Sequence, residues 1–385
     1  MPKSLSVICW VCAVVFLVGG TPSYADPALQ TYLEGALAWL RNRDHDPAMA
    51  ALVQIDGNVA ADAAIGTRAV GHPESVTLDD RWHIGSDTKA FTATLIGTLV
   101  DHQILAFDDT LETLLPSLAK SLHPAYRQVT LRQLLSHTAG LPPLKDTETE
   151  LPTAMAAVRS VRGISAQRLA LARYYLGRPP ASAPGSFEYS NLGFVIAGAI
   201  AEARTGRSWE RLIRERVFNP LGINHVGFGP PGRSGQYDQP LGHGEVSGQV
   251  PLDPADPASD NPAWMGPAGT INISLKDWAL FAQAQLNGAL GRGKLLTPAT
   301  YKALQTPVAD HYALGWGSSL DPDGTPKILT HEGSNGYWVA AISIYPKEGT
   351  IVLLATNFGG PVGQKSIGDL ASSLASHLDL TNRGL

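Results

Sequence analysis

Apolar residues recur at helical spacing near both ends of this chain. Asp26-Pro27 provides a good N-cap and first helical residue for the first of these segments. The apolar positions that follow it are Leu29, Tyr32, Leu33, Ala36, Leu37 and Leu40. Near the C-terminus the same spacing joins Ile367, Leu370, Leu374 and Leu378. The pattern predicts two amphipathic helices, one that opens the mature chain and one that closes it.

Two β-hairpins are predicted beside these helices, because runs of small, β-branched and aliphatic residues flank short polar turns. The first joins Met49 to Ile55 with Val59 to Gly66 through Asp56-Gly57, and the second joins Tyr337 to Tyr345 with Thr350 to Thr356. Between the hairpins, from about Phe107 to Ala289, the pattern is mainly helical.

This order of elements indicates an α/β (α+β) fold: an antiparallel sheet flanked by helices, with an inserted helical subdomain. We expect residues 26–106 and 290–385 to form the α/β subdomain and residues 107–289 the mainly helical one. Within the latter, Gly229 to Gly266 is a long connection rich in Gly and Pro. We expect this connection to border a cleft, with a plain surface excursion as the alternative.

The first 25 residues have the layout of a secretory signal peptide, with an apolar stretch from Leu5 to Val18 and Ser23-Tyr24-Ala25 before Asp26. An uncleaved anchor is the alternative, but the stretch is short against the roughly 20 residues that span a bilayer. Both cysteines, Cys9 and Cys12, lie in this segment. The mature protein is therefore predicted to be periplasmic or secreted, without disulfides or a stable membrane anchor.

The composition fits an ordinary globular protein, with 44% hydrophobic and 16% charged residues among 385. A formal charge of −5 and the absence of any Lys or Arg run argue against nucleic acid as a partner. The sequence has no His, Asp and Glu cluster with metal-ligand spacing and no nucleotide-binding glycine loop, so neither a metal nor another cofactor is predicted.

Three short motifs carry the candidate chemistry. They are, in chain order, Ser86-Asp87-Thr88-Lys89, Tyr189-Ser190-Asn191 and His331-Glu332-Gly333. A Ser and a Lys at i and i+3 share one helix face, so the Lys89 amine can reach the Ser86 hydroxyl. A second Ser-x-x-Lys, at Ser117 and Lys120, looks structural. Only Ser86 opens a periodic apolar run, at a helix start where free N–H groups favour negative charge on oxygen.

Each motif taken singly also has a structural interpretation. Ser86 can be a helix N-cap, Tyr189 a satisfied core tyrosine, and Asn191 the N-cap of a helix that begins at Leu192. Likewise, Lys89 can be a solvated first-turn lysine and His331 an ordinary strand histidine. The three motifs in this one order favour a serine acyl-transfer site.

Together the motifs resemble those of the class C β-lactamase and D,D-peptidase family of serine hydrolases, which includes esterases and D-amino-acid amidases. The resemblance covers nearly all of the mature chain. Supporting stretches are Trp82-His83-Ile84-Gly85-Ser86, Leu134-Leu135-Ser136-His137-Thr138-Ala139-Gly140-Leu141-Pro142, Pro220-Leu221-Gly222, Gly266-Pro267-Ala268-Gly269 and Leu314-Gly315-Trp316-Gly317. It implies a class C β-lactamase-like fold that works without a cofactor.

The resemblance also implies catalytic roles for four residues. Ser86 attacks the substrate carbonyl and forms an acyl-enzyme, while Lys89 and Tyr189 share the proton transfer. Which of these two is the general base stays open, since the ordinary pKa values of both groups lie near 10. His331 is expected to relay a proton or donate a hydrogen bond near pH 7.

Three further residues are implied in substrate binding. Asn191 is expected to contact a substrate carbonyl and to hold the Lys89 amine. Gly333 would let substrate approach its strand closely, and the N–H groups of Ser86 and Ser334 would form an oxyanion hole. His137 is expected to fix a loop by hydrogen bonding, outside the site.

Glu332 departs from the family pattern, which often has a hydroxyl residue at this middle position. In the cleft its carboxylate would repel that of a β-lactam or a terminal D-alanine, unless strand alternation turns it away. We therefore expect a carboxylesterase or a D-amino-acid peptidase or amidase, acting on a small molecule or short peptide. The alternatives are a β-lactamase or D-Ala-D-Ala carboxypeptidase and, less favoured, a penicillin-binding module without turnover.

Overall fold

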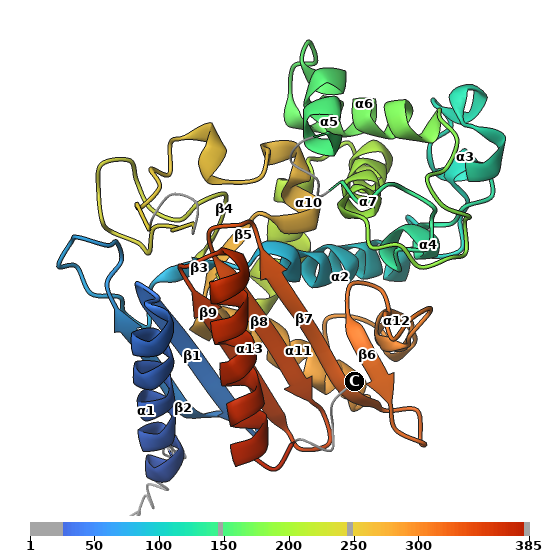
Figure 1. The fold of residues 1–385 in the computed structure, drawn as a ribbon. Helices are drawn as coiled ribbons and strands as arrows, with labels where there is room; N and C mark the ends of the chain where they lie inside the picture. The colour runs from blue at the N-terminus through green and yellow to red at the C-terminus, as the bar shows by residue number, and fades with distance from the viewer. Residues whose placement is uncertain (1–25, 145–148, 245–248, 381–385) are drawn as a thin grey trace, which may run out of the picture.

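Both ends of the chain contribute strands to a six-stranded antiparallel sheet with the order β2-β1-β9-β8-β7-β6 (Figure 1). The computed structural model describes residues 26–144, 149–244 and 249–380, so the predicted signal segment 1–25 lies outside the described residues. The strands are β1 (Ala48–Ile55), β2 (Asn58–Gly66), β6 (Gly317–Leu320), β7 (Pro326–Ser334), β8 (Val339–Tyr345) and β9 (Thr350–Thr356). Both predicted hairpins, β1-β2 and β8-β9, are confirmed.

The two predicted terminal helices, α1 (Pro27–Asp44) and α13 (Gly360–His377), cover one face of this sheet (Figure 1). Met49, Ala51 and Val53 of β1 point into the core beneath them, while the alternate residues Ala50 and Leu52 point to the opposite face. Asp26 caps α1 with its carboxylate, as the sequence predicted. The sheet is thus buried on both sides, which is why β1 carries a nearly continuous apolar run.

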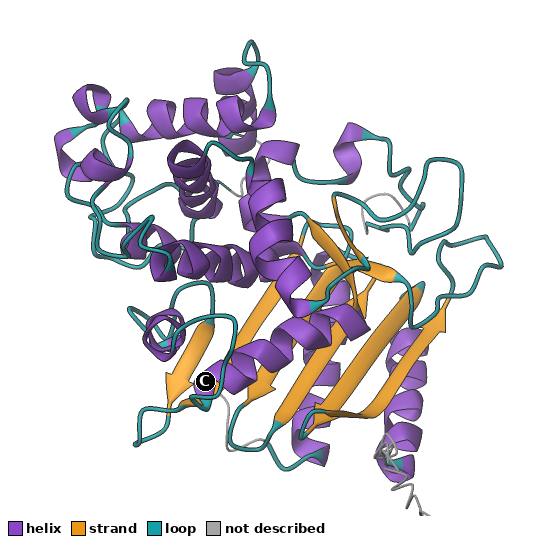
Figure 2. Ribbon diagram, turned by 180° about the vertical axis from the view of Figure 1, so that it is seen from behind, coloured by secondary structure: helices purple, strands orange, loops and turns teal. Residues whose placement is uncertain are grey.

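Helix α11 (Leu275–Ala289) crosses the opposite face and packs against β1, β8 and β9 (Figure 2). Phe281 of α11 stacks on Phe91 of α2 (Thr88–Asp101), with ring centroids 3.6 Å apart. The sequence division assigned α11 to the helical segment 107–289. Its apolar side belongs to a core that the sheet shares with the inserted helices, and α11 contacts α9 of the inserted region as well as the sheet.

The remaining helices lie mostly in the inserted region, beyond one end of the sheet (Figure 1). They are α3 (Leu111–Leu114), η2 (Ala119–Ser121), η3 (Pro124–Tyr126), α4 (Leu131–Leu135), α5 (Glu150–Val158), α6 (Ile164–Leu176), α7 (Asn191–Thr205), α8 (Trp209–Ile213), η4 (Arg214–Phe218), α9 (Asn219–Leu221), η5 (Pro257–Ser259), η6 (Ala263–Met265), α10 (Gly266–Gly269) and, next to the sheet, α12 (Pro298–Gln305). No helix in the described part of the chain is long and apolar enough to cross a membrane.

A second, three-stranded sheet connects the two regions. Its strands are β3 (Arg81–His83), β5 (Ile271–Ser274) and β4 (Val226–Phe228), in the order β3-β5-β4. β3 leads through Ile84 into the 3₁₀ turn η1 (Gly85–Asp87) and then directly into α2. The motif serine therefore lies where a paired strand becomes a buried helix.

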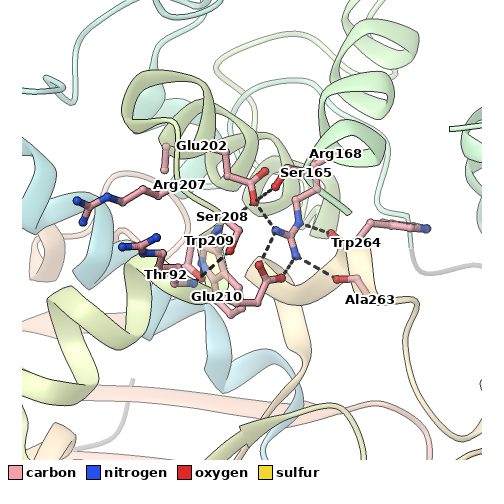
Figure 3. A network of polar contacts seen from close by, with 12 residues as sticks. Thr92, Ser165, Arg168, Glu202, Arg207, Ser208, Trp209, Glu210, Ala263 and Trp264 are labelled. Atoms are coloured by element: carbon pink, nitrogen blue, oxygen red, sulfur yellow. Dashed lines mark hydrogen bonds and ion pairs between the residues drawn. The ribbon is translucent and has the colours of Figure 1, made fainter. Parts of the chain in front are cut away.

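A buried arginine ties the inserted helices to the segment that leads into α10 (Figure 3). The guanidinium of Arg168 on α6 is fully buried and pairs with Glu202 on α7 at 2.6 Å and with Glu210 on α8 at 2.5 Å. It also donates to the carbonyls of Ala263 and Trp264 in η6, at 3.1 and 3.0 Å. The planar, permanently charged guanidinium thus holds four acceptors in one fixed arrangement.

Trp209 extends this network to the nucleophile helix (Figure 3). Its backbone N–H donates to Glu202 at 2.9 Å, and its indole N–H donates to Thr92 on α2 at 3.1 Å. The Thr92 hydroxyl in turn donates to the carbonyl of Pro267 in α10, at 2.7 Å. The network therefore fixes α2 and α10 relative to each other.

Candidate active site

Ser86 lies in the η1 turn, against the end of strand β7. Two glycines permit this contact: a Cβ on Gly333 would stand 2.5 Å from the Ser86 nitrogen, and a Cβ on Gly85 would stand 2.4 Å from the Ser334 nitrogen. Gly85 also has a φ of 48°, in the left-handed region. The backbone segments of Ser86 and Ser334 are thereby held side by side, as the predicted oxyanion hole requires.

The Lys89 amine is completely enclosed and has three near neighbours. Its Nζ lies 2.9 Å from Ser86 Oγ, 2.7 Å from Asn191 Oδ1 and 2.8 Å from the carbonyl oxygen of Ala268 in α10. The last two atoms can only accept hydrogen bonds, so they occupy two N–H bonds of the amine. In the neutral amine, the remaining lone pair faces the Ser86 hydroxyl.

Burial lowers the pKa of Lys89 to about 7, and the nearby Asp87 only partly opposes this shift. Desolvation disfavours the charged ammonium, which explains the direction. Asp87 is itself buried and neither of its carboxylate oxygens has a hydrogen-bond partner among the described residues. Burial, and then the charge of Glu332, raise the pKa of Asp87 well above its usual range. The protonated acid is therefore favoured beside the amine.

Tyr189 lies against both Lys89 and Ser86. The Lys89 amine is 5.0 Å from the centre of its ring. Burial raises the pKa of the Tyr189 phenol well above its ordinary value, although a hydrogen bond with Ser86 opposes the shift. The phenol is therefore neutral near pH 7, whereas the lysine is close to its midpoint.

His137 forms hydrogen bonds with the residues before and after Tyr189, which agrees with the expectation that it fixes a loop. Its carbonyl accepts from the N–H of Glu188 at 2.8 Å, and its Nδ1 accepts from the N–H of Ser190 at 3.0 Å. The two rings lie 4.2 Å apart. His137 thus holds the backbone on both sides of the tyrosine.

Asn191 is not the N-cap of its helix. Ser190 occupies the cap position, and Asn191 is the first residue of α7. Its side chain bonds across the site instead: Oδ1 accepts from Lys89 at 2.7 Å and Nδ2 donates to the carbonyl of Leu144 at 3.1 Å. The alternative structural interpretation of this residue therefore does not fit the structure.

His331 is brought to the site but is not poised to titrate near pH 7. Its Nδ1 lies 2.9 Å from the Glu332 carbonyl oxygen, and its Nε2 lies 3.1 Å from the Tyr312 hydroxyl. Because a carbonyl only accepts, Nδ1 carries the proton and Nε2 accepts from Tyr312. Burial, with the Lys89 charge second, lowers the pKa of His331 to about 3. The proton relay near pH 7 that the sequence suggested does not match this environment.

Tyr312 and Asp87 are site residues that sequence reasoning missed. Tyr312 belongs to no motif, although it stands just before the stretch Leu314-Gly315-Trp316-Gly317 that carried part of the resemblance. Asp87 stands inside the first motif. The second Ser-x-x-Lys of the sequence differs from the first, since Ser117 and Lys120 are both exposed.

Glu332 lines a hollow of about 400 Å³ next to Tyr189, and Ser86 is not among the residues that line it. The lining residues are Tyr189, Tyr312, Gly317, Thr330, His331 and Glu332. Partial burial raises the pKa of Glu332, while one side of the residue stays exposed. A larger hollow, about 700 Å³, lies between α1 and α13 and contains none of these residues.

Comparison with known proteins identifies the family. The model of the Beta-lactamase family matches residues 33–375. The chain belongs to the beta-lactamase family. Penicillin-binding protein 4 of Amycolatopsis lactamdurans is 30% identical over 337 residues, which cover 83% of each chain.

Solved structures resemble this beta-lactamase-family protein over most of its length. SurE superimposes with a TM-score of 0.70 at 25% identity, covering 93% of this chain and 76% of SurE, and a second SurE structure was solved with D-Leu. A class C beta lactamase from Rhodobacter sphaeroides superimposes with a TM-score of 0.69 at 20% identity, covering 90% and 99%. The class C β-lactamase-like fold is therefore confirmed, and the protein is a serine acyl-transferring hydrolase of this family.

The imidazole of His331 is expected to stay neutral from pH 5 to pH 8. Because its pKa is lowered to about 3, the ring takes up a proton only well below this range. ¹H–¹⁵N NMR of the histidine rings, with His331→Gln to assign the signal, measures the titration. A transition with a midpoint between pH 6 and pH 7 would contradict the structure.

Proposed function

We propose that this protein is an exported serine hydrolase that cleaves an ester or amide bond through an acyl-enzyme on Ser86. One observation carries the proposal: the buried Lys89 amine has two fixed acceptors and directs its third position at the Ser86 hydroxyl, 2.9 Å away. The family accounts for the reaction class, and this geometry supports the choice of nucleophile and base.

In the proposed reaction Lys89 is the general base. Ser86 Oγ attacks the substrate carbonyl carbon as its proton passes to Nζ, and the carbonyl oxygen becomes an oxyanion. When the tetrahedral intermediate collapses, the bond between the carbonyl carbon and the leaving group breaks. The departing alcohol or amine then receives the proton that Lys89 Nζ took from Ser86. Water then hydrolyses the acyl-enzyme and restores the Ser86 hydroxyl. A base with a pKa of about 7 suits both directions of this transfer.

Tyr189 is proposed to act beside Ser86 and Lys89 as a neutral phenol. A phenol whose pKa is raised keeps its proton near pH 7 and can therefore donate one hydrogen bond and accept another, so we assign it the path between Ser86 and the leaving group. Asn191 keeps the amine in place. The N–H groups of Ser86 and Ser334 are proposed to bind the oxyanion, and Gly333 admits the substrate beside them.

His331 and Tyr312 are proposed to shape the pocket wall without changing charge. Their mutual hydrogen bond of 3.1 Å consumes the free ring nitrogen of the histidine. A neutral wall next to the lysine avoids a second positive charge, which would repel the protonated amine during turnover.

The substrate is proposed to be a carboxylester or a D-amino-acid peptide or amide without a carboxylate near the scissile bond. Glu332 lines the hollow beside Tyr189, and its charge opposes a substrate carboxylate there. The likeness to SurE, which was solved with D-Leu, supports a D-amino-acid substrate. The likeness to a penicillin-binding protein favours the alternative, a D-Ala-D-Ala carboxypeptidase or β-lactamase. A penicillin-binding module without turnover is the least favoured.

Export is part of the same proposal. Removal of residues 1–25 would leave a periplasmic or secreted enzyme that begins at Asp26, meets a small-molecule or short peptide substrate, and has no stable membrane anchor. Nucleic acid remains an unfavourable partner for a chain with a net charge of −5. No cofactor is needed for the proposed chemistry.

A fluorophosphonate probe followed by intact mass measurement tests the nucleophile. We expect one adduct on the wild-type protein, on a chain that starts at Asp26 when it is recovered from the periplasm or medium. Ser86→Ala should carry no adduct, because it lacks the attacking oxygen, and Ser117→Ala should label like the wild type. Equal labelling of Ser86→Ala would exclude the assigned nucleophile, and a mass that includes Met1 would exclude cleavage.

A substrate panel tests the role of Glu332. It contains p-nitrophenyl acetate and butyrate, D-alanyl p-nitroanilide, a D-Ala-D-Ala peptide and nitrocefin. Glu332→Thr should raise kcat/KM for the carboxylate-bearing substrates relative to the esters by roughly fivefold to tenfold, because it removes one repulsive charge.

The matched control is Glu34→Thr, which removes the same charge from the exposed side of α1. Its substrate ratios should equal those of the wild type. Unchanged ratios in Glu332→Thr would remove the electrostatic account of specificity. Turnover of nitrocefin by the wild type far above every ester and amide would favour the β-lactamase alternative.

A further inference from the structure

The long connection from Gly229 to Gly266 is anchored beside the site by one carboxylate. Asp260 Oδ1 accepts a hydrogen bond from Asn335 Nδ2 at 2.8 Å and lies 3.0 Å from His83 Nε2. The side chain of His83 is fully buried and that of Asp260 is 7% exposed. A single oxygen atom therefore connects the loop to two segments, one ahead of Ser86 and one directly after Ser334.

The His83 side leads to the nucleophile turn. His83 is the last residue of β3, and its Nδ1 accepts a hydrogen bond from the N–H of Gly85 at 3.1 Å. Nε2 then carries the proton and contacts Asp260 Oδ1, although the two atoms are not aligned as in a good hydrogen bond. The Trp338 ring stacks on the His83 ring, with centroids 5.5 Å apart. These contacts fix the residue immediately before Ser86.

The Asn335 side leads to the end of β7. Asn335 Oδ1 accepts from the N–H groups of Tyr337 and Trp338, at 3.1 and 3.2 Å, and so closes the turn between β7 and β8. Its Nδ2 is thereby directed at Asp260. The orientation of Asn335 follows from these three bonds, and Ser334 is its direct neighbour in the chain.

The second carboxylate oxygen of Asp260 indicates that this residue does more than anchor the loop. Asp260 Oδ2 is buried and has no hydrogen-bond partner among the described residues. An unpartnered buried oxygen is unfavourable, so anchoring the loop alone would be served better by an apolar side chain. The cost of leaving Oδ2 without a partner is offset by the contacts that Oδ1 makes with Asn335 and His83.

We propose that Asp260 is a positioning residue for the oxyanion hole: it sets the spacing between the Ser86 and Ser334 N–H groups by holding His83 and Asn335. The inference rests on the proposed function, because it assumes that these N–H groups bind the oxyanion. It adds that a residue of the long connection controls catalysis without contacting substrate. Small displacements of such donors cost rate, since they act mainly in the transition state.

The test compares variants of this bridge in turnover of p-nitrophenyl butyrate and in the rate of fluorophosphonate labelling. Asp260→Ala and Asn335→Ala should each lower kcat and the labelling rate on the order of 10-fold to 100-fold, with KM nearly unchanged. The double variant should lose no more than the worse single one, because both break the same bridge. Asp260→Asn keeps an oxygen at the bridging position and should stay within about threefold of wild type.

The matched control is Asp256→Ala in the same connection. Asp256 accepts from the backbone N–H of Ala258 and contacts neither strand, so its loss should leave kcat unchanged. If Asp260 only anchored the loop, Asp260→Ala would have a lower melting temperature, but the folded variant would keep the kcat of the wild type. If Asp260→Ala does not fold, Asn335→Ala gives the same readout from the other side of the bridge.

The outcomes separate the two proposals. Wild-type kcat in Asp260→Ala or Asn335→Ala, losses that multiply in the double variant, or equal losses in Asp260→Asn and Asp260→Ala would each overturn the positioning role. A wild-type protein that the probe does not label would overturn the proposed function, and this inference with it.

Discussion

The structure depends most on the burial of one amine, that of Lys89, at the point where three parts of the chain meet. α2 carries the lysine, α7 supplies the Asn191 oxygen and α10 supplies the Ala268 carbonyl. An ammonium so enclosed loses its hydration, and the charge of nearby Asp87 makes up for only part of that loss, so the pKa of Lys89 falls to about 7. The fold thereby produces an amine that can exchange protons near neutrality and directs it at Ser86.

Close backbone packing supports this arrangement. Gly85 and Gly333 allow the η1 turn and β7 to pack so closely that a Cβ at either position would clash with the backbone of the other segment. Behind the site, the buried guanidinium of Arg168 and the indole of Trp209 link α10 to α2 through Thr92 (Figure 3). Breaking the buried ion pairs of Arg168 would leave a buried charge without its partner, which is unfavourable. The network therefore also resists displacement of α10, whose Ala268 carbonyl holds the Lys89 amine.

Periodicity predicted the local elements well, because each hairpin and amphipathic helix is encoded within its own segment. The Ser86 and Lys89 pair was equally local, since one helical turn decides it. What the sequence could not predict depends on contacts across the fold. The packing of α11 on the sheet, the hydrogen bond from Tyr312 that occupies His331, and the bridge through Asp260 all join residues far apart in the chain. The burial that neutralises His331 is likewise a property of the assembled site.

A direct titration of Lys89 tests the central claim. In protein labelled with ¹³C at the lysine Cε, the signal absent from Lys89→Met reports this one amine. Because burial disfavours the ammonium, the account predicts a charge-loss transition near pH 7, with Lys89 protonated below it and neutral above it. A transition near pH 10.4, the ordinary value for lysine, would contradict a neutral lysine base and leave the proton transfer from Ser86 without its proposed acceptor.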